Sequence, residues 1–595
     1  MYRQLFKHPI CLINASRKLH NIKTMKTLKN ILLCFVLFTM LLSNAKSQNL
    51  EWAKGMGSTN NDGGNSIAVD AHGNVYTSGY FNGTVDFDPG LGIFNLTSMG
   101  LDDIFISKFD AYGNFVWAKS IGGTNNDWGN SIALDNSGNV YCTGYYCGTA
   151  DFDPGVGTYN LTATGLKDIF ILKLDSSGNF VWAKSIGNTG DDIGNLLVLD
   201  TSANVYITGY FQGIVDFNPE IGAFNLTADS TDIFILKLDV LGNFVYAKSM
   251  GGNGEDIGCS IALDSDGNVY TTGSFQGTSD FDPGAGIFNM TVSPDVSGVY
   301  GNVDIFISKL NNLGNFVWAK SMGGDYYDYG YSIALDASSN VYTTGGFSTP
   351  SIDFDPGVGT FYLTSNGSYD IFISKLDSSG NFIWAKSIGG NGEDFGYSLK
   401  TDAYGNVYTV GDFTDTVDFD PGVGLYNLSN GGNRDFYILK LNSSGDFVFA
   451  IASGAFWYDE CMSIILDDFG NIYYTGYFGM TFDFDPGTGT FNLTSAGGSD
   501  VFVCKLNQTT GLNENEFINT IKVFPNPSNG KVTITESDNS KLIEVFNLLG
   551  EKIYSTITNN NQTTTEIDLT NVPKGIYFVK VDNGKQVHIE KIVLN

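Results

Sequence analysis

The apolar positions of this sequence recur in runs of five to seven residues that end at turns, as β-strands do. One stretch predicts four strands in succession, at Ser131–Asp135 (SIALD), Asn139–Tyr145 (NVYCTGY), Asp168–Leu174 (DIFILKL) and Phe180–Ser185 (FVWAKS). The intervening turns DNSGN and DSSGN place an Asp where it hydrogen-bonds the turn backbone and a Gly where φ is positive. Before residue 510 and after the leader, nothing shows the period of a long amphipathic helix, so the pattern predicts an all-β protein.

Seven copies of this four-strand unit follow one another. The fourth strand carries WAK or an equivalent triplet, which begins at Trp52, Trp117, Trp182, Tyr246, Trp318, Trp384 and Phe449. Successive triplets are 65, 65, 64, 72, 66 and 65 residues apart, and the one long interval contains an insertion, Ser293–Asn302. Four-stranded units repeated at such a period are typical of β-propellers, and an open stack of sheets is the alternative.

The ends of the repeat region favour a closed ring. Leu50–Lys54 (LEWAK) is a fourth-type strand with no first three strands before it, and the last repeat stops after its third strand, Val501–Leu506. Placing the first segment in the last sheet completes that sheet and removes an exposed edge. We therefore predict a seven-bladed β-propeller closed by the N-terminal strand, in which the small, apolar first strand lies innermost and the Trp-bearing fourth strand outermost.

The repeat also resembles a known family. The pattern SIALD…GNVYTTG…DIFISKLD…GNFVWAKS is similar to the SBBP-type bacterial β-propeller repeat, over about residues 50–507. The resemblance implies a fold and no particular activity.

The motif DFDPG lies in the long connection between the second and third strands. Its first residue is Asp in all seven repeats: Asp86, Asp151, Asp216, Asp280, Asp353, Asp418 and Asp483. We expect Val85–Thr97 to form a small hairpin in which Asp88 opens the turn, Pro89 fixes φ and Gly90 takes the third position. In the third repeat Asn218 replaces the Asp88-type residue, which keeps an acceptor without its charge.

A second invariant aspartate precedes the predicted first strand by four residues. Its copies are Asp62, Asp127, Asp192, Asp256, Asp328, Asp394 and Asp459, which we expect around the axial opening on the long-loop face. Both sets have two interpretations. The carboxylates bind loop amides within each repeat, or they converge on a divalent cation such as Ca²⁺, whose preferred ligands are oxygens.

The distribution of charge limits the kinds of partner that the protein can bind. Residues 1–47 hold eight basic and no acidic residues, which leaves 24 basic and 63 acidic residues, a formal net charge of −39, after them. Residues 48–515 alone contain 16 basic and 54 acidic residues, so this body repels nucleic acid and anionic membranes. Thirteen of the 16 basic residues fall in the SKL/LKL and WAK positions, where we expect solubilising outer edges.

The N-terminus is typical of a signal peptide, with Met25 the preferred start. A basic segment precedes Ile31–Leu42, an apolar run too short for a comfortable membrane span. The small residues that follow predict cleavage between Ser47 and Gln48. The expected organisation is a signal segment at 1–47, the propeller at 48–508, a linker at 509–519 and a separate domain at 520–595, with no transmembrane anchor after cleavage.

The C-terminal segment no longer follows the repeat, and its short strands with Pro/Gly turns predict a small β-sandwich. Its motifs resemble the type IX secretion (Por) C-terminal sorting domain of Bacteroidetes over about Thr520–Asn595. The matching residues are Pro525, Asn526, Pro527, Gly530, Gly550, Gly575 and Tyr577. The resemblance implies that type IX machinery carries the protein from the periplasm across the outer membrane, leaving the body secreted or on the cell surface.

Catalytic chemistry has little support in the sequence. After the leader only His72 and His588 occur, and neither repeats, so a Ser-His-Asp or Cys-His site lacks a base. Five cysteines in unrelated positions (Cys142, Cys147, Cys259, Cys461 and Cys504) imply no disulfide framework. We therefore expect a monomeric binding or scaffold module whose long-loop face meets a polysaccharide or protein. A carbohydrate-active enzyme, with Glu255 and Glu393 its least generic carboxylates, and a structural surface or matrix component remain alternatives.

Overall fold

The computed structural model describes residues 47–218, 222–293, 301–348, 351–509, 522–535, 542–547, 552–556, 564–582 and 587–594. Within these ranges every regular element is a β-strand. Contacts divide the chain into a large unit, Ala45–Thr509, and a second unit that includes Thr510–Asn595. The predicted signal segment up to residue 46, and the predicted linker beyond Thr509, lie outside the described residues.

The described part of the large unit contains seven sets of four antiparallel strands, which we call sheets one to seven in chain order. Short hairpin strands extend two of these sheets to six strands and form three separate two-stranded sheets. Their first strands are β2 (Gly63–Val69), β6 (Trp128–Leu134), β12 (Ile193–Leu199), β16 (Ile257–Leu263), β22 (Asp328–Leu335), β28 (Phe395–Thr401) and β34 (Glu460–Leu466). Their second strands are β3 (Val75–Asp86), β7 (Val140–Tyr146), β13 (Val205–Asp216), β17 (Val269–Gln276), β23 (Val341–Phe347), β29 (Val407–Phe413) and β35 (Ile472–Phe478).

The outer half of each sheet follows the same order. The third strands are β4 (Asn95–Phe109), β10 (Asp168–Leu174), β14 (Asn225–Leu238), β20 (Val303–Leu310), β26 (Asp370–Leu376), β32 (Asp435–Leu441) and β38 (Asp500–Thr509). The fourth strands are β5 (Phe115–Gly123), β11 (Phe180–Ile186), β15 (Phe244–Gly252), β21 (Phe316–Met322), β27 (Phe382–Ile388), β33 (Phe447–Ser453) and, in sheet seven, β1 (Ser47–Met56).

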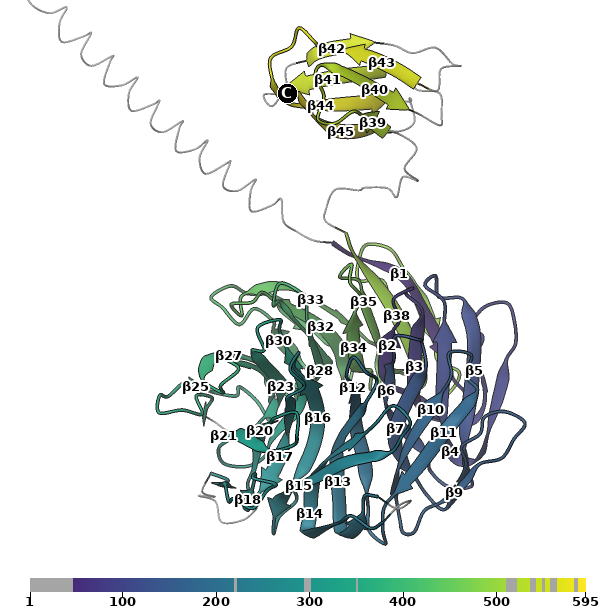
Figure 1. Ribbon diagram of the computed structural model, residues 1–595, viewed down its shortest axis with the longest axis vertical. Helices are drawn as coiled ribbons and strands as arrows, with labels where there is room; N and C mark the ends of the chain where they lie inside the picture. The colour runs from purple at the N-terminus through teal and green to yellow at the C-terminus, as the bar shows by residue number, and fades with distance from the viewer. Residues whose placement is uncertain are drawn as a thin grey trace, which may run out of the picture. The chain divides into compact units, whose positions relative to one another are not determined.

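The first strands form a closed circuit of contacts. Each contacts the first strand of the next sheet, and β34 of sheet seven contacts β2 of sheet one, so the sheets surround a common axis (Figure 1). The N-terminal strand completes the last sheet, because β1 pairs with β38 from Ser47 opposite Thr509 to Met56 opposite Val501. This pairing is longer than the LEWAK segment predicted, and it removes an exposed edge from sheet seven.

The first strands also begin earlier than the pattern indicated. In sheet two β6 starts at Trp128, three residues before the predicted Ser131, and a bulge separates Gly129 from Ser131. The extra residues pair with Tyr145 and Gly144, where a Cβ on Gly144 would lie 1.9 Å from the Trp128 carbonyl oxygen. Glycines that permit close backbone approach look like turn residues in a sequence, which explains the error.

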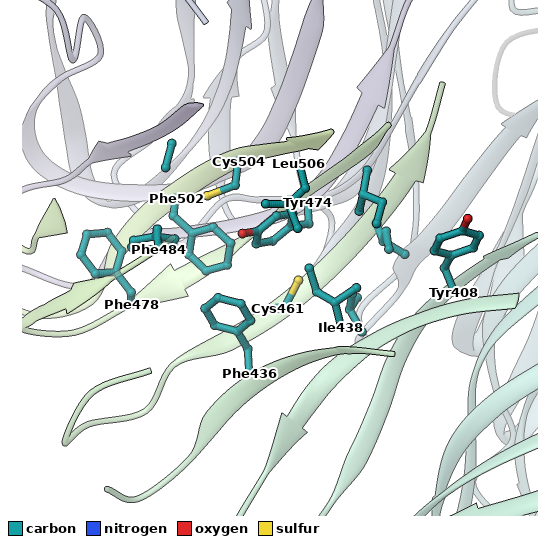
Figure 2. Close-up of a cluster of buried hydrophobic side chains, with 14 of the residues drawn as sticks. Tyr408, Phe436, Ile438, Cys461, Tyr474, Phe478, Phe484, Phe502, Cys504 and Leu506 are labelled. Carbon is teal, nitrogen blue, oxygen red and sulfur yellow. The ribbon is translucent and has the colours of Figure 1, made fainter. Parts of the chain in front are cut away.

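Buried side chains of neighbouring sheets interdigitate. One core cluster joins Tyr408, Phe436 and Ile438 of sheet six to Phe484, Phe502 and other residues of sheet seven (Figure 2). Burying large aromatic and aliphatic side chains contributes roughly 1.5–3 kcal/mol each. The core is therefore continuous from sheet to sheet and does not belong to any one of them.

The predicted DFDPG hairpin is confirmed. Thr84–Asp86 pairs with Asn95–Thr97 at the ends of β3 and β4, and Gly90 N donates to Asp88 Oδ1 across the turn. The same pairing joins the ends of β13 and β14. In the other sheets separate short strands form it: β8 (Thr149–Asp151) with β9 (Asn160–Thr162), β18 (Thr278–Asp280) with β19 (Asn289–Thr291), β24 (Ile352–Asp353) with β25 (Tyr362–Leu363), β30 (Thr416–Asp418) with β31 (Asn427–Ser429), and β36 (Thr481–Asp483) with β37 (Asn492–Thr494).

The tight turns lie together at one end of the ring and are built alike. In sheet one Asp70 Oδ1 accepts the N–H groups of His72 and Asn74, and the ammonium of Lys108 lies 4.7 Å from the centre of the Tyr76 ring. All seven third-strand lysines sit over such a ring, at 4.4–5.3 Å. These lysines are buried or half-buried, so our expectation of a solubilising edge is wrong for the SKL position.

The C-terminal unit contains two described sheets. One has β39 (Lys522–Phe524), β40 (Lys531–Thr535) and β43 (Thr564–Asp568), and the other has β42 (Lys552–Thr556), β41 (Leu542–Asn547), β44 (Gly575–Asp582) and β45 (Val587–Leu594). Both contribute to one apolar core, with Val532 and Ile534 from the first sheet and Val545 and Val579 from the second. This is the arrangement that alternating strands with one apolar face produce.

Candidate functional site: the variable end of the ring axis

The Asp62-type carboxylates accept hydrogen bonds from backbone N–H groups. Asp127 shows the pattern, since its Oδ2 accepts the Gly123 N–H at 2.7 Å and its Oδ1 accepts the Cys147 N–H at 2.9 Å. All seven copies accept such a pair, and all are fully buried. They do not line an axial opening as we expected, because their oxygens point into the loop that each one ties together.

The structure adds a third invariant aspartate at the start of the third strand. Its copies are Asp103, Asp168, Asp232, Asp304, Asp370, Asp435 and Asp500. Asp103 Oδ2 accepts the Met99 N–H, and its carboxylate packs on Gly122, where a Cβ would lie 2.5 Å from its Cγ. Burial raises the pKa of Asp103 to about 6. The signal, an Asp before an apolar pair in every third strand (IF in five repeats, FY in the sixth and VF in the seventh), was visible in the sequence.

The two invariant sets meet between neighbouring sheets. Burial, together with the charge of Asp103 in the preceding sheet, raises the pKa of Asp127 to about 7. Asp500 and Asp62 form the corresponding pair where sheet seven meets sheet one, and burial raises the pKa of Asp500 to about 7. We call these two sets the frame aspartates, since they fix the loops at every junction.

The Asp86-type carboxylates belong to the hairpin turns. Asp86 Oδ1 accepts the N–H groups of Asp88 at 3.1 Å and Phe94 at 2.8 Å, and the other six copies make the same two bonds. Among the described residues no group of three or more His, Cys, Asp or Glu side chains has the geometry of a metal site. Calcium binding by either predicted set stays a prediction.

Positions next to the frame aspartates differ from sheet to sheet. The residue before the third-strand aspartate is a different amino acid in every repeat: Asp102, Lys167, Thr231, Val303, Tyr369, Arg434 and Ser499. The residue after the Asp62-type aspartate varies similarly: Gly63, Trp128, Ile193, Ile257, Tyr329, Phe395 and Glu460. The end of the second strand contributes Tyr80, Tyr145, Tyr210, Ser274, Gly346, Asp412 and Tyr477. We call this end of the axis, with these side chains, the mouth.

Aromatic rings gather at the mouth in two groups. In sheets one and two Tyr80 stacks on Trp128 with ring centres 4.1 Å apart and planes 6° apart, and Trp128 Nε1 donates to Asp102 Oδ2 at 3.0 Å. In sheets five and six Tyr329 lies 6.3 Å from Tyr369, which lies 4.9 Å from Phe395. Tyr80, Trp128, Tyr329 and Tyr369 are partly exposed, so both groups present aromatic surface to solvent.

At the mouth, the described residues of sheets six and seven include a cluster of charged side chains. Arg434, the only arginine after residue 17, donates to Asp412 Oδ2 at 2.9 Å, pairs with Glu393, and lies 5.6 Å from the Phe395 ring centre. Asp412 is fully buried, and burial together with the charge of Glu460 raises its pKa to about 7. Burial also raises the pKa of Glu460.

The loop before β34 exposes three consecutive aromatic side chains beside this cluster. Phe456, Trp457 and Tyr458 are 70%, 57% and 50% exposed, whereas the sister loop in sheet two reads Thr-Asn-Asn. The Asp459 N–H donates to the Arg434 carbonyl, which holds the loop against the variable position of sheet six. A soluble protein rarely exposes such a patch without a partner for it.

Of the two glutamates singled out in the sequence, Glu393 belongs to the mouth through Arg434, and the charge of Glu255 acts on Tyr210 and Tyr329. Sequence reasoning missed Asp412, Arg434, Glu460 and the aromatic groups. Comparing the repeats position by position would have found them, because they are departures from an otherwise constant pattern.

In the C-terminal unit the predicted motif residues are placed as follows. Asn526 Oδ1 accepts the Val593 N–H at 3.0 Å, and Tyr577 donates from its hydroxyl to the Pro573 carbonyl at 2.7 Å. Pro525 and Pro527 follow cis peptide bonds, and Gly530 and Gly575 have positive φ. Gly550 lies outside the described residues. Ser47 and Gln48, the predicted cleavage site, lie in β1 opposite Thr509 and Gln508.

Two family models match parts of the chain. Residues 522–595 match the secretion system C-terminal sorting domain, and residues 116–145 match the beta-propeller repeat. The tail therefore indicates export by type IX secretion to the outside of the cell. No helix in the described residues is both long and apolar enough to cross a membrane.

Several other proteins show weaker similarity to this chain. An uncharacterized WD repeat-containing protein of Acanthamoeba polyphaga mimivirus is 25% identical over 504 residues, which is 72% of this chain and 36% of that protein. The regulatory protein FlaEY of Caulobacter vibrioides is 25% identical over 184 residues, 31% of this chain and 18% of that protein. The chain thus spans about a third or less of these relatives. Sqt1 of Chaetomium thermophilum aligns over 72% of this chain and 97% of its own, at 11% identity and a TM-score of 0.35.

Proposed function

We propose that this chain is an exported, monomeric seven-bladed β-propeller whose mouth binds a polysaccharide. In this proposal each four-stranded sheet is a blade, β1 closes the ring, and the organisation is a signal segment at 1–47, a propeller at 48–508, a linker at 509–519 and a sorting β-sandwich at 520–595. The circuit of first-strand contacts and the β1–β38 pairing support the closed ring.

The observation that carries the binding role is the collection of partly exposed aromatic rings at the mouth. Ligand sites are lined mainly by aromatic and apolar side chains with a few convergent polar groups. Here the Tyr80–Trp128 stack, the Tyr329–Tyr369–Phe395 group and the exposed Phe456–Tyr458 loop supply the aromatic surface.

The polar groups of the mouth favour a hydroxyl-rich ligand. Asp102, Glu255 and Glu393 are acceptors, and sugar hydroxyls are donors that match them. The faces of pyranose rings carry C–H groups that pack on aromatic faces, while an anionic polymer would be repelled by a body of 54 acidic and 16 basic residues. A neutral polysaccharide satisfies both conditions.

Glycoside hydrolysis is the second candidate, and the Asp412–Glu460 pair is what favours it. Two interacting carboxyl groups, one with its pKa raised to about 7, resemble the acid and base of a glycosidase. Asp412 is fully buried, however, so Glu460 would be the group that meets a substrate. A structural surface or matrix role is the third candidate and predicts no soluble ligand.

The test is a screen of purified protein against a panel of neutral and acidic polysaccharides for binding and for released reducing ends. Trp457→Ala is expected to weaken binding at least tenfold, because it removes a 57% exposed ring at the mouth. Phe469→Ala removes an 89% exposed ring from a tight turn of the same sheet and should leave binding unchanged. Equal losses in both variants, or no ligand in the panel, would contradict the proposal; hydrolysis abolished by Glu460→Gln would favour the enzyme.

A further inference from the structure

The axis contains a cavity of about 290 Å³ that is lined by the first strands of all seven sheets. Its described lining includes one charged side chain, Lys400 of β28, and no carboxylate. In the other repeats the Lys400 position holds Ala68, Ala133, Val198, Ala262, Ala334 and Ile465. Lys400 therefore places a positively charged side chain at a position where the other six repeats have an aliphatic one.

Among the described residues no ion pair, side-chain hydrogen bond or ring contact involves Lys400. The third-strand lysines of the repeat, by contrast, each lie over a Tyr ring. Burial accordingly lowers the pKa of Lys400 below its ordinary value. An unpaired ammonium in such surroundings is costly, and an anion beside it would offset that cost.

The same cavity contains a circle of serine hydroxyls. Six of the first strands contribute one each: Ser66, Ser131, Ser260, Ser332, Ser398 and Ser463. Each Oγ accepts a backbone N–H from the next sheet, as Ser398 does from Ile464 and Ser463 from Ile67. Each hydroxyl proton is not used within the described residues, so it is available to donate into the cavity.

Lys400 and Ser398 are two residues apart on β28 and therefore face the same side of the strand. Leu399, between them, is fully buried in the sheet-to-sheet core. The side chains that meet the axis here are an ammonium and hydroxyl donors, without a charged acceptor among the lining residues. A set of donors with a positive charge is the chemistry that recognises oxyanions.

We propose that the axial cavity binds a small oxyanion group, a carboxylate, sulfate or phosphate, on Lys400 and the neighbouring serine hydroxyls. The site is independent of polysaccharide binding at the mouth, because Trp128, Trp457 and Glu460 do not line the cavity. The volume accommodates a tetrahedral oxyanion with water around it, since a water occupies about 30 Å³ in the liquid.

Isothermal titration of the whole protein with inorganic phosphate and with sulfate, at constant ionic strength against chloride, tests this. One saturable site is expected. Lys400→Met, which resembles the aliphatic residues of the other repeats, should weaken it at least tenfold, and Lys400→Arg should retain it. Lys320→Met removes the same charge from fourth strand β21 and should have no effect. Unchanged binding in Lys400→Met, or equal loss in Lys320→Met, would overturn the proposal.

A measurement on the unaltered protein decides the matter even if Lys400→Met does not fold. Mass spectrometry would follow acetylation of individual lysines by a limiting reagent, with and without phosphate. Phosphate should slow the acetylation of Lys400 several-fold and leave that of Lys320 unchanged. Equal rates at Lys400 with and without phosphate would overturn the proposal. Loss of polysaccharide binding in Trp457→Ala with phosphate binding retained would separate this site from the mouth.

Discussion

At the tight-turn end of the ring the seven sheets are nearly identical, whereas at the mouth each sheet carries its own side chains. Each turn between the first and second strands uses an Asp to accept two backbone N–H groups, and the third-strand Lys beside it lies over a Tyr ring. At the mouth, Asp102 of sheet one corresponds to Arg434 of sheet six and Tyr369 of sheet five. Repetition therefore marks architecture here, and departure from the repeat marks where a ligand would be recognised.

The mouth itself contains both kinds of residue. The Asp62-type frame aspartates are invariant because each accepts two backbone N–H groups that would otherwise be buried without acceptors. Their neighbours in sequence are free to vary because they extend from a backbone that is already fixed. Because the backbone is constant and the neighbouring side chains vary, seven similar sheets produce a mouth whose side chains differ from sheet to sheet.

The largest effect is expected from breaking the ring. Deleting Leu50–Gly55 removes most of β1, including the buried Trp52 and Ala53, and exposes the β38 edge. The variant should unfold at a temperature lower by about 10 °C or more and form oligomers through the open edge. Size-exclusion chromatography and thermal melting measure both. A monomer that melts like the intact protein would contradict closure through the chain ends.

A smaller difference in stability should distinguish a frame aspartate from a variable residue of the mouth where sheets one and two meet. Asp127→Ala leaves the Gly123 and Cys147 N–H groups without acceptors, at about 1–3 kcal/mol each. Asp102→Ala, at a partly exposed variable position in contact with Trp128, should cost no more than about 1 kcal/mol. Urea unfolding compares the two. Equal losses of stability would erase the proposed distinction.

Stability should fall as the pH rises from about 4 to 7 and should change little above that. Burial raises the pKa values of Asp103 and Asp62 to about 6 and those of Asp127 and Asp500 to about 7, above the roughly 3.9 of an unfolded chain. The folded state therefore binds more protons than the unfolded state between about pH 4 and 7, and loses that advantage above it. The melting temperature should be several degrees higher near pH 5 than at pH 8. A flat or rising profile over this range would contradict it.

The smallest effect expected is that of calcium. Both predicted sets of aspartates already accept backbone N–H bonds, so millimolar Ca²⁺ against chelator, at fixed ionic strength, should move the melting temperature by about 1 °C or less. A rise of several degrees that disappears when Asp86-type residues become Asn would instead support the cation hypothesis.

The sequence specified the repeated part of the molecule well. Alternation and turn residues placed the strands of each sheet, and the unpaired end segments indicated the β1–β38 pairing, because these depend on local pattern and edge chemistry. The three extra residues at the start of β6 were missed because Gly144 allows a close backbone approach and does not form a turn.

The mouth was predicted only in outline. The long-loop face was expected to be variable, but Asp412, Arg434 and Glu460 lie in three separate segments, and their proximity depends on how sheets six and seven pack. The Asp62-type frame aspartates were proposed as a candidate site because they are repeated, but the repeated residues support the backbone. Departures from the repeat, such as Arg434 at the mouth and Lys400 in the axial cavity, are the basis of the two proposed binding sites.

Hydrogen exchange of the whole protein with and without a polysaccharide identified in the screen tests the central claim most directly. The account predicts slower exchange at the long-loop end, around Asn126–Trp128, Tyr327–Tyr329 and Phe456–Glu460. Amides of the tight turns, such as Gly113 and Gly138, should exchange at the same rate with and without ligand. Protection confined to the tight-turn end, or to the DFDPG hairpins, would contradict the assignment of the mouth as the binding site.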